Sequence, residues 1–215
     1  MKQARFWKKI LLWGLALAPL LIAAVVYRSL PDQIPVHWDL NGTVSTGPKA
    51  TIWLTSSLGV IVTAGMLFTR HIDPKRENYS RFAGAYETFL VVFNLFMLAM
   101  NLFTLTETFR PGTLDAQVFV MVLVGILFAV IGNLMPKFKH NYFIGIRTPW
   151  TLASETVWYR THRLCGPLWV IGGLMMLLTA FLPATAAITV TLADVAVLVV
   201  IPYVMSYLWF KEEQN

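Results

Sequence analysis

Residues 118–135 read VFVMVLVGILFAVIGNLM and contain no charged side chain. A helix that crosses a membrane needs about 20 mostly apolar residues, because it must span about 30 Å of hydrocarbon at about 1.5 Å per residue. Windows of this kind occur at residues 10–30, 51–69, 83–105, 118–135, 164–182 and 188–210. We therefore predict an all-α polytopic membrane protein with six transmembrane helices.

The composition supports the same fold class. Hydrophobic residues make up 57% of the 215 residues and charged residues 13%, against about 25% charged in an ordinary soluble domain. A soluble fold would have too little polar chain to cover so much apolar surface. The single cysteine, Cys165, excludes an internal disulfide framework.

The first window could also be a secretory signal peptide, with Lys2, Arg5, Lys8 and Lys9 as its basic region. Its apolar run is longer than the usual h-region of about 7–15 residues. We therefore interpret it as an uncleaved first span.

Basic residues predict the orientation. With the N-terminus in the cytoplasm, 14 of the 17 Lys and Arg residues lie inside, and only Arg28, Lys49 and Arg110 lie outside. An even number of spans then places both termini in the cytoplasm. The positive net charge of +6 is explained by this asymmetry, so we expect no direct nucleic-acid partner.

The first outer loop, residues 30–42, reads LPDQIPVHWDLNG. His37 and Asp39 lie two residues apart, so they face the same side of an extended segment and could contact a metal or a peptide. Trp38 suits the headgroup region, and Asn41 begins an Asn-Gly turn. The alternative interpretation is a structural cap on the outer helix ends. A catalytic metal site normally needs three protein ligands, and the predicted topology puts the other histidines on the opposite side; we predict no metal and no cofactor.

The second inner loop, residues 136–163, is polar yet rich in aromatic residues. Thr148-Pro149 is a good helix start, with a hydroxyl at the N-cap and proline at the first helical position. We predict an interfacial cytoplasmic helix near 149–163, with aromatic anchors and basic residues close to anionic lipid. The alternative is a plain connector that follows the membrane surface.

Several short motifs in and around this loop are similar to the signature of the SdpI family of bacterial membrane immunity and signalling proteins. They are Gly132-Asn133, Pro136, Asn141, Gly145, Arg147-Thr148-Pro149-Trp150-Thr151, Val157-Trp158 and His162-Arg163. The segment IPVHW at residues 34–38 resembles the small N-terminal domain that often precedes this signature. The resemblance implies an N-terminal two-helix unit at 1–82 and an SdpI-like four-helix unit at 83–215.

The resemblance also implies a function. It indicates a multi-pass protein of the bacterial cell membrane that gives resistance to a secreted killing peptide. It further implies signalling, in which the protein holds a cytoplasmic repressor at the membrane. We expect the peptide to meet His37, Trp38, Asp39 and Asn41. We expect the partner to meet residues displayed by the inner loop: Asn141, Gly145, Arg147, Thr148, Pro149, Trp150, Thr151, Trp158, His162 and Arg163.

Few polar groups lie inside the predicted spans. The candidates are Asn94, Asn101, Asn133 and Asp194. They could line a polar path or ligand cavity, because ionisable residues in lipid are costly. The structural interpretation, which we favour, is interhelical hydrogen bonding worth about 0.6 kcal/mol on average.

Two other classes of protein stay open at this point. A small transporter of a peptide or lipid would show substrate-dependent flux in proteoliposomes. A membrane enzyme could use His140, His162 and Glu155, which lie close together in the sequence. No HExxH, Ser-His-Asp or phosphate-cradling glycine motif accompanies them, so we predict no enzymatic activity.

Overall fold

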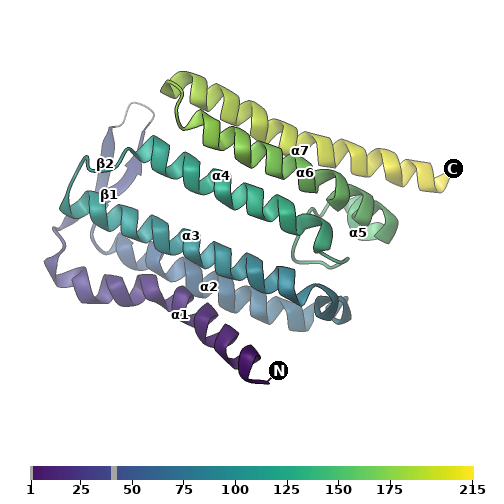
Figure 1. Ribbon diagram of the computed structural model, residues 1–215, viewed down its shortest axis with the longest axis horizontal. Helices are drawn as coiled ribbons and strands as arrows, with labels where there is room; N and C mark the ends of the chain where they lie inside the picture. Colours follow the sequence, from purple (N-terminus) through teal and green to yellow (C-terminus); the bar gives the residue numbers. More distant parts are fainter. Residues whose placement is uncertain (1, 40–42) are drawn as a thin grey trace. The chain divides into compact units, whose positions relative to one another are not determined.

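The computed structural model describes residues 2–39 and 43–215 and the side chains from Phe6 onward, apart from residues 40–42 (Figure 1). Helices dominate it. They are α1 (Lys2–Val26), α2 (Thr51–Ile72), α3 (Ala83–Phe109), α4 (Ala116–Leu134), α5 (Pro149–Ala153), α6 (Glu155–Thr179) and α7 (Ala184–Gln214). Short 3-10 segments lie at Tyr27–Ser29, Arg76–Phe82 and Met135–Lys137. All the α-helices except α5 are long and apolar enough to cross a membrane, so the predicted six spans are confirmed.

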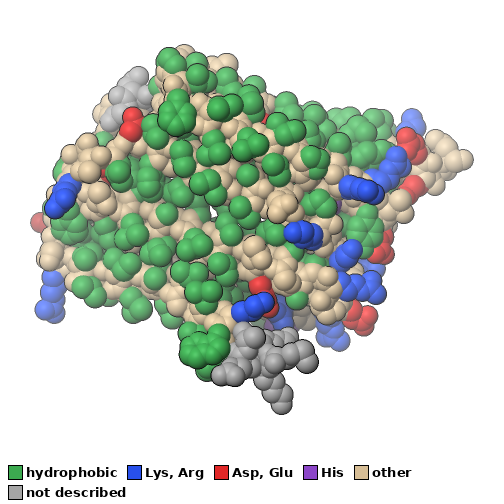
Figure 2. All heavy atoms as spheres, viewed as in Figure 1, with side chains coloured by type: hydrophobic (Ala, Val, Ile, Leu, Met, Phe, Trp, Pro, Cys, Tyr) green, Lys and Arg blue, Asp and Glu red, His purple; other side chains and the backbone are tan. Residues whose placement is uncertain are grey.

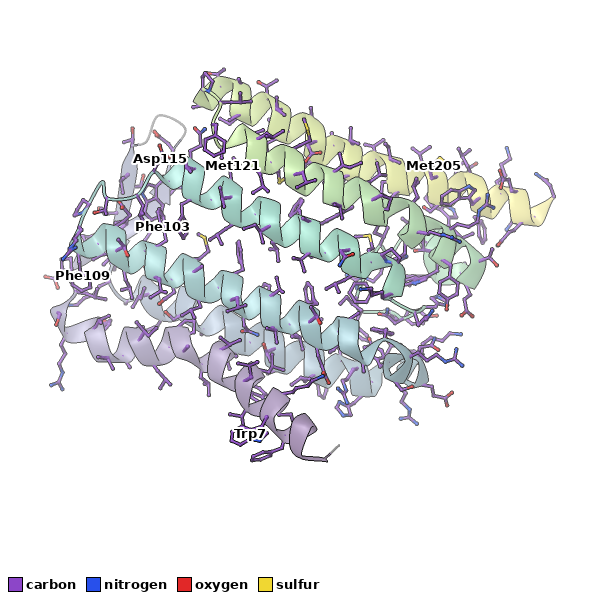
Figure 3. All side chains as sticks on the ribbon, viewed as in Figure 1. Trp7, Phe103, Phe109, Asp115, Met121 and Met205 are labelled. Carbon is purple, nitrogen blue, oxygen red and sulfur yellow. The ribbon has the colours of Figure 1, made fainter. Side chains whose placement is uncertain are left out.

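A small β-hairpin interrupts the helical pattern. Its strands, β1 (Gln33–Trp38) and β2 (Val44–Pro48), pair in antiparallel fashion, with a bulge between Pro35 and His37. The Trp38 ring packs on Phe103 of α3 at a centroid distance of 4.8 Å (Phe103 is labelled in Figure 3). The sequence predicts an extended segment here, but not the second strand with which it pairs. The hairpin gives the otherwise all-α fold one β element.

Contacts divide the chain into two compact units, the first made of residues 1–65 and 90–120 and the second of residues 66–89 and 121–215. In the first unit, an apolar core joins α1 and α2 to the base of the hairpin. It consists of Ala23, Leu30, Ile34, Ile52 and Leu105. Ile34 is buried because it is the strand residue that points away from solvent.

In the second unit, glycines bring α4 and α6 into backbone contact. A Cβ on Gly173 would lie 2.5 Å from the Gly125 carbonyl oxygen and 2.5 Å from the Ala129 amide nitrogen. A Cβ on Gly132 would lie 2.7 Å from the Gly166 carbonyl oxygen. Small residues of this kind let helices approach closely where no hydrophobic effect drives their association.

Helices α6 and α7 of this unit lie side by side and join through a short turn (Figure 1). Hydrophobic side chains cover much of their visible surface, and charged side chains gather toward the C-terminal end of α7 (Figure 2). That pattern is expected of helices that cross hydrocarbon and end in water.

The interfacial helix predicted over 149–163 is present as two pieces. Ser154 has extended backbone angles, φ −129° and ψ 127°, and it ends α5. Its hydroxyl then accepts a hydrogen bond from the Val157 amide at 3.2 Å and caps α6. Residues 155–163 are therefore the first turns of the fifth spanning helix, and only Pro149–Ala153 forms a separate helix.

Candidate functional site

The segment between the Met135–Lys137 turn and α5, residues 138–148, is called the connecting loop below. Asn141 holds it together and is fully buried. Its Oδ1 accepts hydrogen bonds from the amides of Phe143 (2.9 Å) and Ile144 (2.8 Å). Its Nδ2 donates to the carbonyls of Lys139 (2.8 Å) and Ile144 (3.0 Å). One side chain thus satisfies four backbone groups that have no helix or strand to pair with.

Side chains from the α2–α3 connection, which belongs to the same unit, hold this loop in place. The Asp73 carboxylate is buried and accepts hydrogen bonds from the Tyr79 hydroxyl (2.9 Å) and the Tyr142 amide (2.9 Å). The Asn78 side-chain amide donates to the His140 carbonyl at 2.8 Å. Asp73 and Asn78 lie more than sixty positions away in the sequence from Tyr142 and His140, so their role was not predicted from the sequence.

Trp158 and His162 of α6 form the floor beneath the loop. Their rings stack at a centroid distance of 4.1 Å, and the Trp158 indole N–H donates to the Phe138 carbonyl at 2.9 Å. The Ile146 amide donates to His162 Nε2 at 3.0 Å, so this nitrogen carries no proton. The proton is therefore on Nδ1, which lies 2.8 Å from the Trp158 carbonyl and donates to it.

Gly145 lies directly on this floor. Its φ of +110° is a backbone angle that residues other than glycine rarely adopt. In addition, a Cβ there would collide with His162 Nε2. Only glycine therefore fits between the loop backbone and the Trp158–His162 pair.

The expectation that the inner loop displays all of its predicted residues to a partner is wrong for five of them, which are buried: Asn141, Thr148, Thr151, Trp158 and His162. The exposed fractions of Trp158 and His162 are 0% and 1%, because the loop covers them. They stabilise the loop from within, and neither side chain reaches the surface.

Thr148 is the N-cap of α5, as predicted, and Thr151 completes a capping box that was not predicted. The Thr151 amide donates to the Thr148 hydroxyl at 3.1 Å, and the Thr148 amide donates to the Thr151 hydroxyl at 2.9 Å. The Thr148 hydroxyl also donates to Ser206 of α7 at 3.0 Å. Pro149, which is exposed, occupies the first helical position.

Trp150 fixes α5 from the other side. Its ring packs against Tyr203 and Tyr207 of α7 at centroid distances of 4.9 and 5.1 Å. The short helix is thus held on α7 by one hydroxyl pair and one aromatic cluster.

Gly145 and Pro149 are exposed among the predicted residues of the inner loop, and so are its two predicted arginines. Arg147 is exposed, and its guanidinium donates to the Tyr142 carbonyl at 3.1 Å. Arg163 is exposed on α6. Nearby, Arg160 pairs with Glu212 at 3.0 Å and lies over the Trp209 ring, which ties α6 to the end of α7.

The hairpin separates its predicted residues in the same way. Trp38 faces Phe103, whereas His37 and Asp39 are exposed. An Asp39 carboxylate oxygen accepts a hydrogen bond from the Thr43 amide at 2.7 Å and so helps to close the turn. Asn41 lies outside the described residues.

Two of the predicted intramembrane polar residues make interhelical hydrogen bonds in the first unit. Asn94 Nδ2 donates to the Thr63 hydroxyl at 2.8 Å, and Asn101 Nδ2 donates to the Ser56 hydroxyl at 2.7 Å. Both join α3 to α2 and are buried. This is the structural role that sequence analysis favours.

The other two differ. Asn133 is exposed on α4. Asp194 of α7 is partly exposed and lies against Gly172 of α6, where a Cβ would come within 2.9 Å of its carboxylate. Among the described residues, no group of three or more His, Cys, Asp or Glu side chains is arranged to hold a metal ion.

The six apolar helices and the matches below make the chain a multi-pass protein of the bacterial cell membrane. Residues 137–206 match the SdpI/YfhL protein family, and residues 14–60 match a domain of unknown function, DUF1648. The chain is 23% identical over 192 residues to "Immunity protein SdpI" of Bacillus subtilis (strain 168), which covers 89% of this chain and 90% of that protein. The predicted resemblance to the SdpI family is therefore confirmed.

No solved structure matches the chain. The fold and the connecting loop are consequently described from this structure alone. The SdpI/YfhL match begins at Lys137 and takes in the whole connecting loop, α5 and α6.

Proposed function

We propose that this protein is a membrane immunity protein that gives its cell resistance to a secreted antimicrobial peptide, without enzymatic activity. The observation that carries the proposal is the similarity to an immunity protein over nearly the full length of both chains. A match that was confined to the spans could reflect shared hydrophobicity, but this one includes the polar connecting loop. That relative is named for immunity and not for a reaction.

We propose that the peptide is met at the hairpin. A secreted peptide arrives from outside, and the hairpin follows the first span, on the side that the basic residues assign to the exterior. Exposed His37 and Asp39 offer it a ring nitrogen and a carboxylate. Asn41, which lies outside the described residues, belongs to the same proposed surface by its sequence position.

For signalling, we propose that a cytoplasmic repressor binds the outside of the connecting loop and α5. Arg147, Pro149 and Arg163 are exposed and suit this role, with the partly exposed Trp150 beside them. Buried Asn141, Thr148, Thr151, Trp158 and His162 would position this surface without touching the partner, and Gly145 would do so through its contact with the Trp158–His162 pair. We further propose an N-terminal unit at 1–82 and a C-terminal unit at 83–215. The family matches at 14–60 and 137–206 are compatible with this division.

Survival of a sensitive strain under a secreted antimicrobial peptide tests the proposal. The strain carries either the parent protein or a variant at the same expression level. We expect the parent to raise survival, and His37→Ala and Arg147→Ala each to reduce the protection, since each removes an exposed group of a proposed surface.

Two matched variants serve as controls. Ser45→Ala changes an exposed residue that pairs with His37 across the hairpin, and Arg76→Ala removes an exposed basic residue of the α2–α3 connection. Both should protect as the parent does. If the parent gives no protection, the function is wrong; if His37→Ala and Arg147→Ala protect fully, the proposed surfaces are wrong.

A further inference from the structure

His140 lies in the middle of the connecting loop and is buried, with 4% of its surface exposed. Its carbonyl accepts the hydrogen bond from Asn78, so its backbone is fixed to the α2–α3 connection. Its ring lies 5.2 Å from the Trp158 ring and 6.1 Å from the Tyr142 ring, measured between centroids. The imidazole thus fills the space between the loop and the α6 floor.

The hydrogen-bonding capacity of the two ring nitrogens is not satisfied. Within the described parts of the chain, neither of its nitrogens has a hydrogen-bond partner of good geometry. A neutral imidazole leaves one donor and one acceptor unpaired, and each unpaired buried group costs free energy. Protonation would turn both nitrogens into donors and add a charge, which makes burial less favourable still.

The charged groups around the ring come from each element that packs on it. Lys75 and Asp73 belong to the α2–α3 connection and Glu155 to the first turn of α6; the floor adds a titratable but neutral ring, His162. Burial lowers the pKa of His140, and the Lys75 ammonium lowers this pKa further; Glu155, the Leu152 backbone and Asp73 act in the opposite direction but are outweighed.

We propose that His140 is an acid-sensitive latch, which keeps the connecting loop closed on α6 while its ring is neutral and opens the loop when the ring is protonated. Opening would expose the Trp158–His162 floor. It would also leave the surface around Arg147 without a fixed conformation. The consequence for a cytoplasmic partner rests on the proposed function; the latch itself does not, because it can be measured on the protein alone.

The direction of the pH dependence follows from the linkage between protonation of His140 and opening of the loop. In the closed loop the pKa of His140 lies below its ordinary value, so the open form binds more protons as the pH falls. The closed form has its full stability above about pH 6.5, the ordinary pKa of histidine, and loses it progressively below that value. Each unit of pKa difference corresponds to about a tenfold change in the opening equilibrium.

Hydrogen exchange of the full chain in lipid nanodiscs tests the latch. The amides of Tyr142, Phe143 and Ile144 are bonded to Asp73 and Asn141 in the closed loop, so they report its opening. We expect their protection, corrected for intrinsic exchange rates, to fall several-fold from pH 7.5 to pH 5.5. His140→Phe, which keeps an aromatic ring but cannot be charged, should abolish most of this fall, and His71→Phe at an exposed histidine should leave it unchanged.

Two surface variants separate electrostatics from packing. Lys75→Met removes the cation that disfavours the charged ring, so the pH dependence should weaken; Glu155→Gln removes an anion that favours it, so the dependence should strengthen. A fall in protection that His140→Phe leaves intact would overturn the latch. If His140→Phe does not fold, equal pH dependence in Lys75→Met and Glu155→Gln would overturn it as well.

Discussion

At the scale of single residues, Gly145 is a position where the connecting loop leaves no room for a side chain above α6. Gly145→Ala would place a methyl group against His162 Nε2 and force alanine to a φ of +110°. We expect it to lower the free energy of unfolding by about 2 kcal/mol or more, from backbone strain and overpacking together. Thermal unfolding of the purified protein in detergent measures this.

The control for this substitution is Gly84→Ala, at a helical position with nothing within 4 Å of the new methyl group. It should leave stability unchanged or raise it by a few tenths of a kcal/mol, because alanine loses less entropy in a helix. An equal loss for both variants would show that the Gly145 contact is not special.

The roles of individual residues are the part of the site that the sequence predicts least well. The spacing of Thr148 and Thr151 is local, so their capping interaction follows from a pattern three residues long. The burial of Trp158 and His162 depends on Gly145 and Phe138, which fold back onto α6 from the loop. A tryptophan and a histidine near a helix end resemble interfacial anchors until that fold is known.

At the scale of secondary-structure elements, α6 is defined by two contacts of different kinds. Its first turns carry the loop floor, and its later turns pack on α4 through glycines. Hydropathy predicts the later turns of α6 as a span, because they are apolar. It does not predict the first turns, because Arg160, His162 and Arg163 make them polar. The hairpin is missed for a similar reason: a bulged pair of short strands has no clear alternation to detect.

Gly173→Ala tests the α4–α6 contact. The new methyl group would lie 2.5 Å from backbone atoms of Gly125 and Ala129, which cannot move aside as a flexible side chain could. We expect a loss of about 1–3 kcal/mol from overpacking, measured by SDS-induced unfolding in mixed micelles. Gly65→Ala, on α2 with open space around it, is the matched control and should change stability little. Similar unfolding curves for parent and Gly173→Ala would contradict the close packing of these helices.

At the scale of the whole molecule, the spans are the most predictable feature. Six apolar windows agree with six helices, since crossing hydrocarbon requires a long run of apolar residues whatever the neighbouring helices are. The orientation rests on a different property, the excess of Lys and Arg on one side. The proposed division of function between the hairpin and the connecting loop depends on that orientation more than on any single contact.

Cysteine labelling in intact cells tests this topology most directly. In a background with buried Cys165 replaced by alanine, Ser45→Cys marks the hairpin and Arg76→Cys marks the α2–α3 connection; both positions are exposed. A maleimide that cannot cross membranes should label Ser45→Cys in intact cells, and Arg76→Cys only after the cells are permeabilised. Labelling of both positions from outside, or of Arg76→Cys alone, would contradict the account.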